Sequence, residues 1–273
     1  MPGRLARVSA EGDDEYVLTL VLQVGKTERP GQTDALETAA RAVLAILADE
    51  RSAGTGEWAE AMRAWQDARI RKVVRRARGA EWRRAAALPG ITVTSQLPTA
   101  AAAGDAPAVD VAGAGQAAEE GRQGLHPGEA PVGTGAGAAV PAEVRVFPPV
   151  PLDEVPKELA KLQVTGTDLE DAEAPGEPAG GVPVLWVNPG LEMSTGKTMA
   201  QVGHAAHLAW MVLPEVARKT WVEDGFRLAV RTASAAQWKQ LVRSGLPVVQ
   251  DAGFTEVEPG SRTVVADHPA LRR

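Results

Sequence analysis

Short apolar runs alternate with longer amphipathic stretches along most of the chain, and this pattern predicts an α/β fold. Residues 16–24 (YVLTLVLQV) form one apolar run and residues 182–187 (VPVLWV) form another. Each is followed by a stretch with apolar positions at helical spacing, over residues 34–50 and 197–213. Runs of this length are typical of buried strands, and the 3.6-residue spacing indicates helices that pack against them.

Further elements are predicted in the same order after each strand–helix pair. The remaining strands are expected at 70–74, 91–94 and 144–147, and at 226–231, 247–250 and 263–266. Shorter helices are expected at 80–87 and 234–243. Ser194, Thr195 and Ser234 stand just before helical stretches, where a side-chain oxygen can accept hydrogen bonds from the first backbone N–H groups.

The two ordered regions also share residues at matching positions, which indicates an internal repeat. Gly31 falls opposite Gly196 at a helix start, and Trp82 falls opposite Trp238 in a later helix. We therefore expect two similar α/β domains or one pseudo-symmetric pair. Chance similarity between two segments rich in Ala and Val is the alternative interpretation.

Between the ordered regions the composition changes. Residues 98–141 are rich in Ala, Gly, Pro and Glu and have almost no large apolar side chains. Such a segment cannot bury enough surface to offset its ordering entropy, so we expect it to be disordered. Residues 165–181 are acidic and rich in Gly and Pro, as in a linker. The predicted organisation is a first domain over 15–164 with the insertion 98–141, a linker over 165–181, and a second domain over 182–273.

The composition excludes several classes of protein. The chain has no cysteine, so it has neither disulfides nor thiolate chemistry. No apolar run reaches the length of about 18 residues that a membrane-spanning helix needs, and the N-terminus lacks a signal-peptide pattern. These features predict a cytoplasmic protein without a membrane partner.

The net charge of −6 first argues against a nucleic-acid partner, but its distribution changes this interpretation. Residues 98–181 carry a net charge of −10, whereas residues 1–97 and 182–273 each carry +2. The excess acid thus lies in the insertion and linker. A basic run in the first region holds eight positive charges against Glu81, and it is a candidate for phosphate contacts or an ordinary solvated face. Its members are Arg69, Arg71, Lys72, Arg75, Arg76, Arg78, Arg83 and Arg84.

One predicted helix carries polar residues on a single face. Lys197, Gln201 and His204 are spaced i, i+4 and i+7, starting at the first turn. Polar groups there are expensive if they are buried without a role. On spacing alone, the pattern is also explained without a functional site, by a solvated Lys197 and a partly buried His204 whose hydrogen bonds are satisfied.

A phosphate-binding loop is a rival interpretation of the same segment. A strand followed by Gly190 and then Gly196-Lys197-Thr198 approximates the pattern GxxxxGK[ST]. Five residues separate the two glycines instead of four, and no later strand clearly supplies a magnesium-binding Asp. A nucleotide site is therefore disfavoured.

Two segments together resemble a known family. Residues 193–206 (MSTGKTMAQVGHAA) and residues 251–263 (DAGFTEVEPGSRT) match, in order and spacing, the motifs of the peptidyl-tRNA hydrolase type 2 family. Taken alone, Asp251 before a Gly turn would be an ordinary turn residue. The resemblance covers about residues 182–269, which is almost the whole second region.

The resemblance implies both a fold and an activity. The fold is a four-stranded mixed sheet flanked by helices, which we expect in two copies. The activity is hydrolysis of the ester between a peptide and the 3′ ribose of tRNA, without a metal or another cofactor. The family's catalytic positions correspond to Lys197, Asp251 and Thr255. Gly196, Gln201 and His204 correspond to substrate-binding positions nearby.

Roles for the catalytic positions follow from ester chemistry. Asp251 would orient or deprotonate the attacking water. Lys197 would bind the oxyanion or a phosphate from its place at a helix N-terminus. Thr255 would hold the water or Asp251.

Several positions depart from the family pattern. A lysine usual two residues before Lys197 is Thr195 here, the first loop reads Asn188-Pro189-Gly190, and Glu256 follows Thr255. These changes remove positive charge or add negative charge, so an RNA- or protein-binding module with weak catalysis is the alternative function.

The first region departs further, since Gln32 stands at the position of Lys197. We expect a degenerate copy there, which would form an intramolecular pseudo-dimer with the second.

Overall fold

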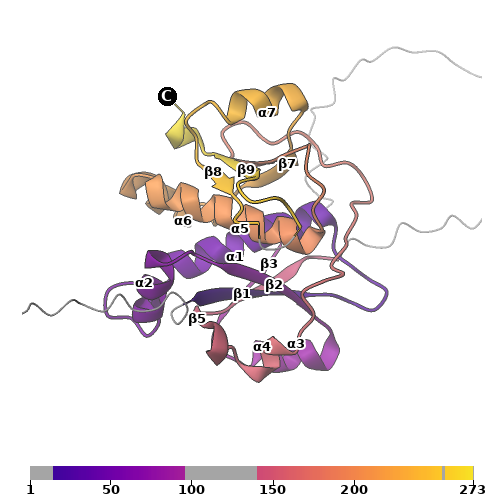
Figure 1. Ribbon diagram of the computed structural model, residues 1–273, viewed down its shortest axis with the longest axis vertical. Coiled ribbons are helices and arrows are strands. Elements are labelled where there is room, and N and C mark those ends of the chain that lie inside the picture. Colours follow the sequence, from indigo (N-terminus) through magenta and orange to yellow (C-terminus); the bar gives the residue numbers. More distant parts are fainter. Residues whose placement is uncertain (1–14, 96–139, 254–255, 273) are drawn as a thin grey trace, which may run out of the picture. The chain divides into compact units, whose positions relative to one another are not determined.

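A computed structural model describes residues 15–95, 140–253 and 256–272 of the chain. Most of the predicted insertion 98–141 and the predicted site residue Thr255 lie outside these ranges. We refer to residues 15–95 and 140–164 as the N-terminal half, and to residues 182–272 as the C-terminal half (Figure 1).

The C-terminal half is built on a four-stranded mixed sheet with the order β7-β6-β9-β8. Strand β6 runs parallel to β7 and antiparallel to β9, and β8 runs antiparallel to β9. The strands are β6 (Val184–Val187), β7 (Ala229–Thr232), β8 (Val248–Gln250) and β9 (Arg262–Asp267). All four strands fall within one to three residues of the predicted positions.

The N-terminal half has the same core order, β2-β1-β4-β3, with the same strand directions. Its strands are β1 (Tyr16–Gln23), β2 (Lys72–Ala77), β3 (Ile91–Thr94), β4 (Glu143–Val146) and β5 (Val150–Pro151). The short β5 was not predicted and makes this a five-stranded sheet. It continues along β1 beyond Pro148 and Pro149, which have no N–H to donate to the ladder. Two mixed sheets flanked by helices confirm the predicted fold class.

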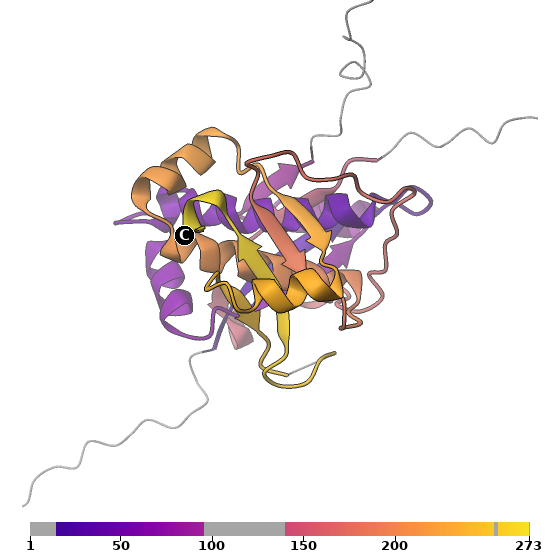
Figure 2. The same ribbon diagram turned by 90° about the horizontal axis from the view of Figure 1, so that it is seen from above.

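The helices cover the sheets on both faces (Figure 1 and Figure 2). They are α1 (Gln32–Ala48), α2 (Ala59–Asp67), α3 (Gly79–Ala86), α4 (Lys157–Ala160), α5 (Thr195–Val212), α6 (Glu215–Glu223) and α7 (Ala235–Leu241). Helices α2 and α6 were not predicted. Helices α1, α3, α5 and α7 lie where the sequence placed them, and Ser194 and Ser234 are N-caps whose hydroxyl oxygens accept backbone N–H groups.

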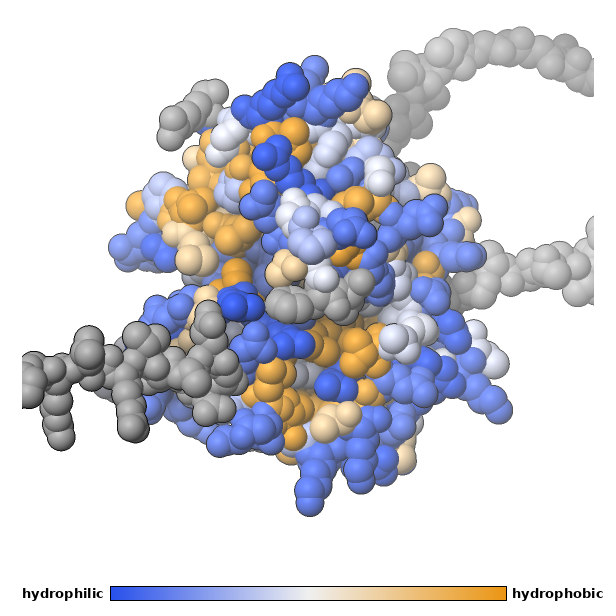
Figure 3. All heavy atoms as spheres, viewed as in Figure 1, coloured by the Kyte–Doolittle hydropathy of each residue, from blue (hydrophilic) through white to orange (hydrophobic). Residues whose placement is uncertain are grey.

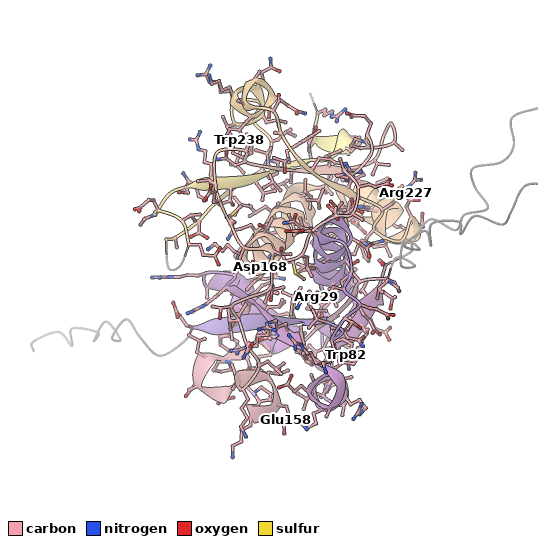
Figure 4. All side chains as sticks on the ribbon, turned by 90° about the vertical axis from the view of Figure 1, so that its right-hand side faces the viewer. Arg29, Trp82, Glu158, Asp168, Arg227 and Trp238 are labelled. Carbon is pink, nitrogen blue, oxygen red and sulfur yellow. The ribbon has the colours of Figure 1, made fainter. Side chains whose placement is uncertain are left out.

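The hydrophobic core is continuous across the two halves. Helices α1 and α5 lie between the two sheets and pack against each other, and one buried cluster joins their side chains to both sheets. A Cβ atom added at Gly203 of α5 would lie 3.0 Å from Val43 of α1, so the helices approach closely there. The outer faces have smaller clusters, in which Trp82 of α3 and Trp238 of α7 lie on the two sheets' far sides (Figure 4).

The helix–strand connections of the two halves correspond at a constant shift of 156 residues. Helix α2 begins at Ala59 and α6 at Glu215, and both helices contain nine residues. Trp65 Nε1 donates to the Arg71 carbonyl over 2.9 Å, and Trp221 Nε1 donates to the Arg227 carbonyl over the same distance. Each tryptophan thus fastens its helix to the start of the next strand.

The same correspondence extends to an unusual backbone position. Ile70 and Phe226 have positive φ values of 47° and 57°, although neither is glycine. Their backbone N–H groups donate to the carbonyls of Trp65 and Trp221, which holds both turns in this costly conformation. The two halves therefore share local geometry as well as strand order.

Polar contacts cross between the halves beside the apolar core. Glu37 of α1 accepts hydrogen bonds from the Val230 N–H and from Arg231 on β7, with the guanidinium 3.0 Å away. Burial raises the pKa of Glu37, while the bonds to Val230 and Arg231 act in the opposite direction. Gln32 of α1 donates to Thr195 of α5 over 3.4 Å.

The acidic segment 165–181 contains no helix or strand, but it is held against both halves. Asp171 accepts hydrogen bonds from the N–H and hydroxyl of Thr33, at 2.9 and 2.6 Å, and so caps α1 from a distant part of the chain. A Cβ at Gly31 would lie 2.8 Å from the same carboxylate, which explains a glycine at that helix start. Leu169 is buried and donates to Thr195.

No helix in the described ranges is long and apolar enough to cross a membrane. Exposed hydrophobic residues gather at the end of α5 and on α6, where Figure 3 shows apolar surface. They are Met211, Val212, Val216 and Val222.

Candidate active site

The candidate site forms where the first turn of α5 meets the loop after β8. The Ser194 hydroxyl caps α5 by accepting the Lys197 N–H over 3.2 Å. This fixes the first turn and directs the side chains of Lys197 and Gln201 to one face. Asp251 follows β8 directly, so the sheet places its carboxylate opposite that face.

Asp251 is held by three hydrogen bonds from described residues. Lys197 Nζ lies 2.6 Å from Oδ2 of Asp251, and Gln201 Nε2 donates to the same oxygen over 2.8 Å. The Gly253 N–H donates to Oδ1 over 2.7 Å. The side chains of Lys197 and Asp251 are 12% and 9% exposed, so this ion pair is largely shielded from solvent.

The loop that carries Asp251 is fixed by its own backbone. Asp251 N–H and carbonyl bond to the Ser261 carbonyl and the Gly260 N–H. Gly253 has a φ of 80°, and a Cβ there would come within 2.4 Å of Pro259. A glycine is therefore required at this turn, and this explains the glycine in the Asp-Ala-Gly motif.

Gln201 is positioned in turn by a residue that sequence reasoning did not assign to the site. The Thr263 hydroxyl on β9 donates to Gln201 Oε1 over 2.6 Å, and Thr263 is fully buried. This bond fixes the orientation of the amide, so that its NH₂ group faces Asp251. Thr263 could have been assigned to the site from the sequence, because it is the last residue of the motif over residues 251–263.

The ion pair determines the charge of Asp251. Burial by itself raises the pKa of the carboxyl group, but the hydrogen bonds from Lys197, Gly253 and Gln201, together with the Lys197 charge, outweigh it and lower the pKa below its usual value. Asp251 is thus ionised at neutral pH. It is a weaker base than burial alone would produce, which favours orientation of a water molecule over complete removal of its proton.

His204 continues the same face of α5, but its ring nitrogen Nδ1 bonds to the other half. It lies 3.3 Å from Nζ of Lys72, which belongs to β2. Desolvation lowers the pKa of His204 well below its usual value, and the charges of Lys72, His207 and Lys197 act in the same direction. The polar face of α5 therefore contacts Asp251 at one end and Lys72 at the other. The sequence did not associate Lys72 with the site.

Gly196 lies under the 165–181 segment. Its N–H donates to the Thr167 carbonyl over 3.3 Å, and a Cβ would be in ordinary contact with the Thr167 side chain, 3.5 Å away. Gly196 is buried there, one residue before Lys197.

Two residues that depart from the family pattern, Glu256 and Thr195, are held by hydrogen bonds. Glu256 accepts hydrogen bonds from the N–H and hydroxyl of Ser194, at 2.7 and 2.8 Å, which places a negative charge at the N-terminus of α5. A carboxylate is stabilising at a helix N-terminus. Thr195 is buried and accepts the Leu169 N–H over 3.0 Å, so a lysine could not replace it without disturbing that contact.

The basic run of the N-terminal half is not a uniform phosphate-binding surface. Lys72 is buried, and Arg71 forms an ion pair with Glu15. Arg75 donates to the carbonyls of Ala160 and Leu162. In contrast, Arg83 and Arg84 are exposed on α3.

A cavity of about 330 Å³ is lined in part by the β6–α5 loop. Its lining comes from α1, the 165–181 segment and the ends of β6 and β7, including Gln32, Asp171 and Arg231. Neither Lys197 nor Asp251 lines it. In the described ranges, no cluster of three or more His, Asp or Glu side chains could hold a metal ion.

Comparison with known proteins identifies the C-terminal half. A family model described as peptidyl-tRNA hydrolase PTH2 matches residues 182–273. A protein named peptidyl-tRNA hydrolase from Pyrobaculum aerophilum is 38% identical over 92 residues, which cover 29% of this chain and 77% of that protein. Proteins of the same name from Halobacterium salinarum and Aeropyrum pernix are each 33% identical, over 87 and 97 residues. These alignments cover 29% and 30% of this chain, and 78% of each relative. The chain therefore belongs to the peptidyl-tRNA hydrolase PTH2 family.

Proposed function

We propose that this chain hydrolyses the ester bond between a peptide and the 3′ ribose of tRNA, and so returns the tRNA for reuse. The observation that carries the proposal is the linked set Lys197, Asp251, Gln201 and Thr263, within the part of the chain that matches the family. We infer the substrate from the names of the relatives, and we infer the mechanism from the geometry of this set.

Asp251 is the group that positions the attacking water. A carboxylate has about four lone-pair sites, and described residues occupy three of those on Asp251. A water bound at the remaining site on Oδ1 would direct its oxygen at the ester carbonyl. As the C–O bond to the ribose breaks, the 3′ oxygen leaves with a proton and the peptide leaves as a carboxylate.

Lys197 has two linked roles in this mechanism. It keeps Asp251 ionised, and its ammonium group lies where negative charge develops on the carbonyl oxygen or where a phosphate is bound. Thr255 follows in the same loop and is proposed to hold the water. Gln201 and His204 would contact the 3′ end of the tRNA.

The direct test is release of peptide from peptidyl-tRNA by the full chain, with and without EDTA. We expect release at the same rate in both conditions, because the mechanism uses no metal. Loss of activity in EDTA that is restored by a divalent cation would contradict the metal-independent mechanism.

A binding module is the alternative, and Glu256 is the observation that favours it. Its carboxylate at the start of α5 opposes the approach of phosphate groups. Retained tRNA binding without peptide release would support this alternative over hydrolysis.

We also propose that the N-terminal half is a degenerate copy of the hydrolase fold and forms an intramolecular pseudo-dimer with the C-terminal half. The shared strand order, the 156-residue shift and the contact of α1 with α5 support this.

The isolated C-terminal half tests the pseudo-dimer. Without α1, the apolar face of α5 is exposed, and residues 182–273 should self-associate or lose solubility, as measured by light scattering. A folded, monomeric 182–273 fragment would contradict the pseudo-dimer.

A further inference from the structure

A buried lysine from the N-terminal half contacts the hydrolase helix. Lys72 at the start of β2 is 6% exposed, and its Nζ atom lies 3.3 Å from each of three polar atoms. These are the Ile70 carbonyl, Nδ1 of His204 and Nδ1 of His207, the last two on α5. The Trp65 ring lies 4.6 Å from Nζ and also stacks on the His207 ring, with centroids 4.9 Å apart.

This cluster contains no acidic partner among the described residues. Buried lysines are usually paired with a carboxylate, because taking an ammonium out of water is costly. Here desolvation lowers the pKa of Lys72 well below its usual value. Burial, with the Lys72 charge, lowers the pKa of His207 to about 2, so His207 stays neutral.

The fold does not require these polar groups. With the shift of 156 residues, Lys72 corresponds to Leu228, which directly precedes β7 and is buried and apolar. With the shift of 165 residues that relates Gly31 to Gly196, His204 and His207 correspond to Ala39 and Ala42 of α1, which are also buried. The equivalent positions in the fold are thus occupied by three apolar residues. The three titratable residues occur only at the contact with α5, the helix that carries the candidate site.

The contacts with Lys72 link the tautomers of both histidine rings. Lys72 has at least two N–H donors in either of its charge forms, so it can donate to both Nδ1 atoms. A neutral histidine that accepts at Nδ1 carries its proton on Nε2. When Lys72 donates to its Nδ1, His204 is an Nε2–H donor, one turn beyond the Gln201 that holds Asp251.

We propose that Lys72 is a positioning residue for the hydrolytic site, which it serves by holding His204 as the neutral Nε2–H tautomer that donates a hydrogen bond to the 3′ end of the substrate. The proposal rests on the proposed function. In this way the N-terminal half contributes to catalysis through a buried side chain, although Gln32 stands at its position equivalent to Lys197.

The test compares wild type with Lys72→Met and Lys72→Leu in the full chain. Methionine keeps the reach of the side chain without its donors, and leucine reproduces the residue at the equivalent position. Lys219→Met on the exposed face of α6 is the matched control. Two quantities are measured: the tautomer of His204, by long-range ¹H–¹⁵N NMR, and kcat and KM for release of peptide.

We expect Nδ1 of His204 to be unprotonated in wild type and in Lys219→Met, and the ring to become a mixture of tautomers in both Lys72 variants. We expect kcat to fall by about 10–100-fold, as when the hydrogen-bond partner that orients a metal-binding histidine is removed, with KM nearly unchanged. Thermal unfolding should show that the Lys72 variants are at least as stable as wild type, because an apolar side chain replaces a buried charge.

An unchanged His204 tautomer, or an unchanged kcat, in a folded Lys72 variant would overturn the proposal. If wild type releases no peptide, the proposed function fails, and the NMR comparison still decides whether Lys72 fixes His204. The two failures are therefore distinguishable.

Discussion

Replacing Asp251 by Asn should lower kcat/KM for release of peptide from peptidyl-tRNA by about 10²–10⁴-fold, the usual contribution of a group that handles the reacting proton. The amide keeps the shape of the side chain but loses the negative charge that Lys197 and Gln201 hold in place. Circular dichroism should show the same fold. The loss would therefore reflect chemistry and not structure.

The pH dependence of wild type follows from the same ion pair. Since the pKa of Asp251 is lowered, the reactive carboxylate is present at pH 5 and above, and protonation removes it only in more acidic solution. The pair also stabilises the fold above the pKa of Asp251 in the unfolded chain, and this contribution is lost as the pH falls through the lower pKa of the folded state. We expect no loss of rate from Asp251 between pH 5 and 8.

Asp267→Asn is the matched control for this substitution. Asp267 is another buried carboxylate of the C-terminal half, but it pairs with Arg272 and accepts from Trp186. Its loss should reduce stability without changing kcat/KM at a temperature where the protein is folded. An Asp251→Asn protein within twofold of wild-type activity would show that the proposed role of Asp251 is wrong.

Replacing Trp65 by Ala should reduce the free energy of unfolding by about 3–5 kcal/mol, as is usual for a large aromatic side chain removed from a core. Trp65 is fully buried, and its indole N–H holds the Arg71 carbonyl. It also stacks on His207 of the other half, so its removal leaves a cavity where the halves meet. Thermal or denaturant unfolding of the full chain measures the effect.

Trp238→Ala provides the comparison, because Trp238 lies on the outer face of the C-terminal sheet and is only partly buried. Its substitution should cost clearly less than that of Trp65. Equal losses for the two variants would mean that the contact between the halves contributes little to stability.

Much of the fold could be predicted from the sequence because its strands and long helices follow simple patterns. Strand β1 is covered on both faces, so it is almost continuously apolar, and α5 has a regular stripe of small apolar residues. Helices α2 and α6 were missed because each is only nine residues long and mostly polar, with few buried apolar residues such as Trp65 and Trp221.

The candidate site could be predicted in part, for a similar reason. Lys197, Gln201 and Asp251 lie in two motifs whose spacing is visible in the chain, and the structure brings them within hydrogen-bonding distance. Thr263 lies in the matched motif, but its hydrogen bond to Gln201 depends on the packing of α5 against β9, which the spacing does not specify.

By itself, the sequence determined the fold class, the order of the elements in each half and the family of the C-terminal half, because these depend on local spacing and on motifs close together in the chain. Only the tertiary structure decided that Asp171 caps α1, that Lys72 is buried and that its amine contacts His204. Lys72 stands 132 residues before His204, within what appeared as a basic run. Its environment is set by the packing of two sheets around α1 and α5, and a hydrogen bond over that separation leaves no periodic signal in the chain.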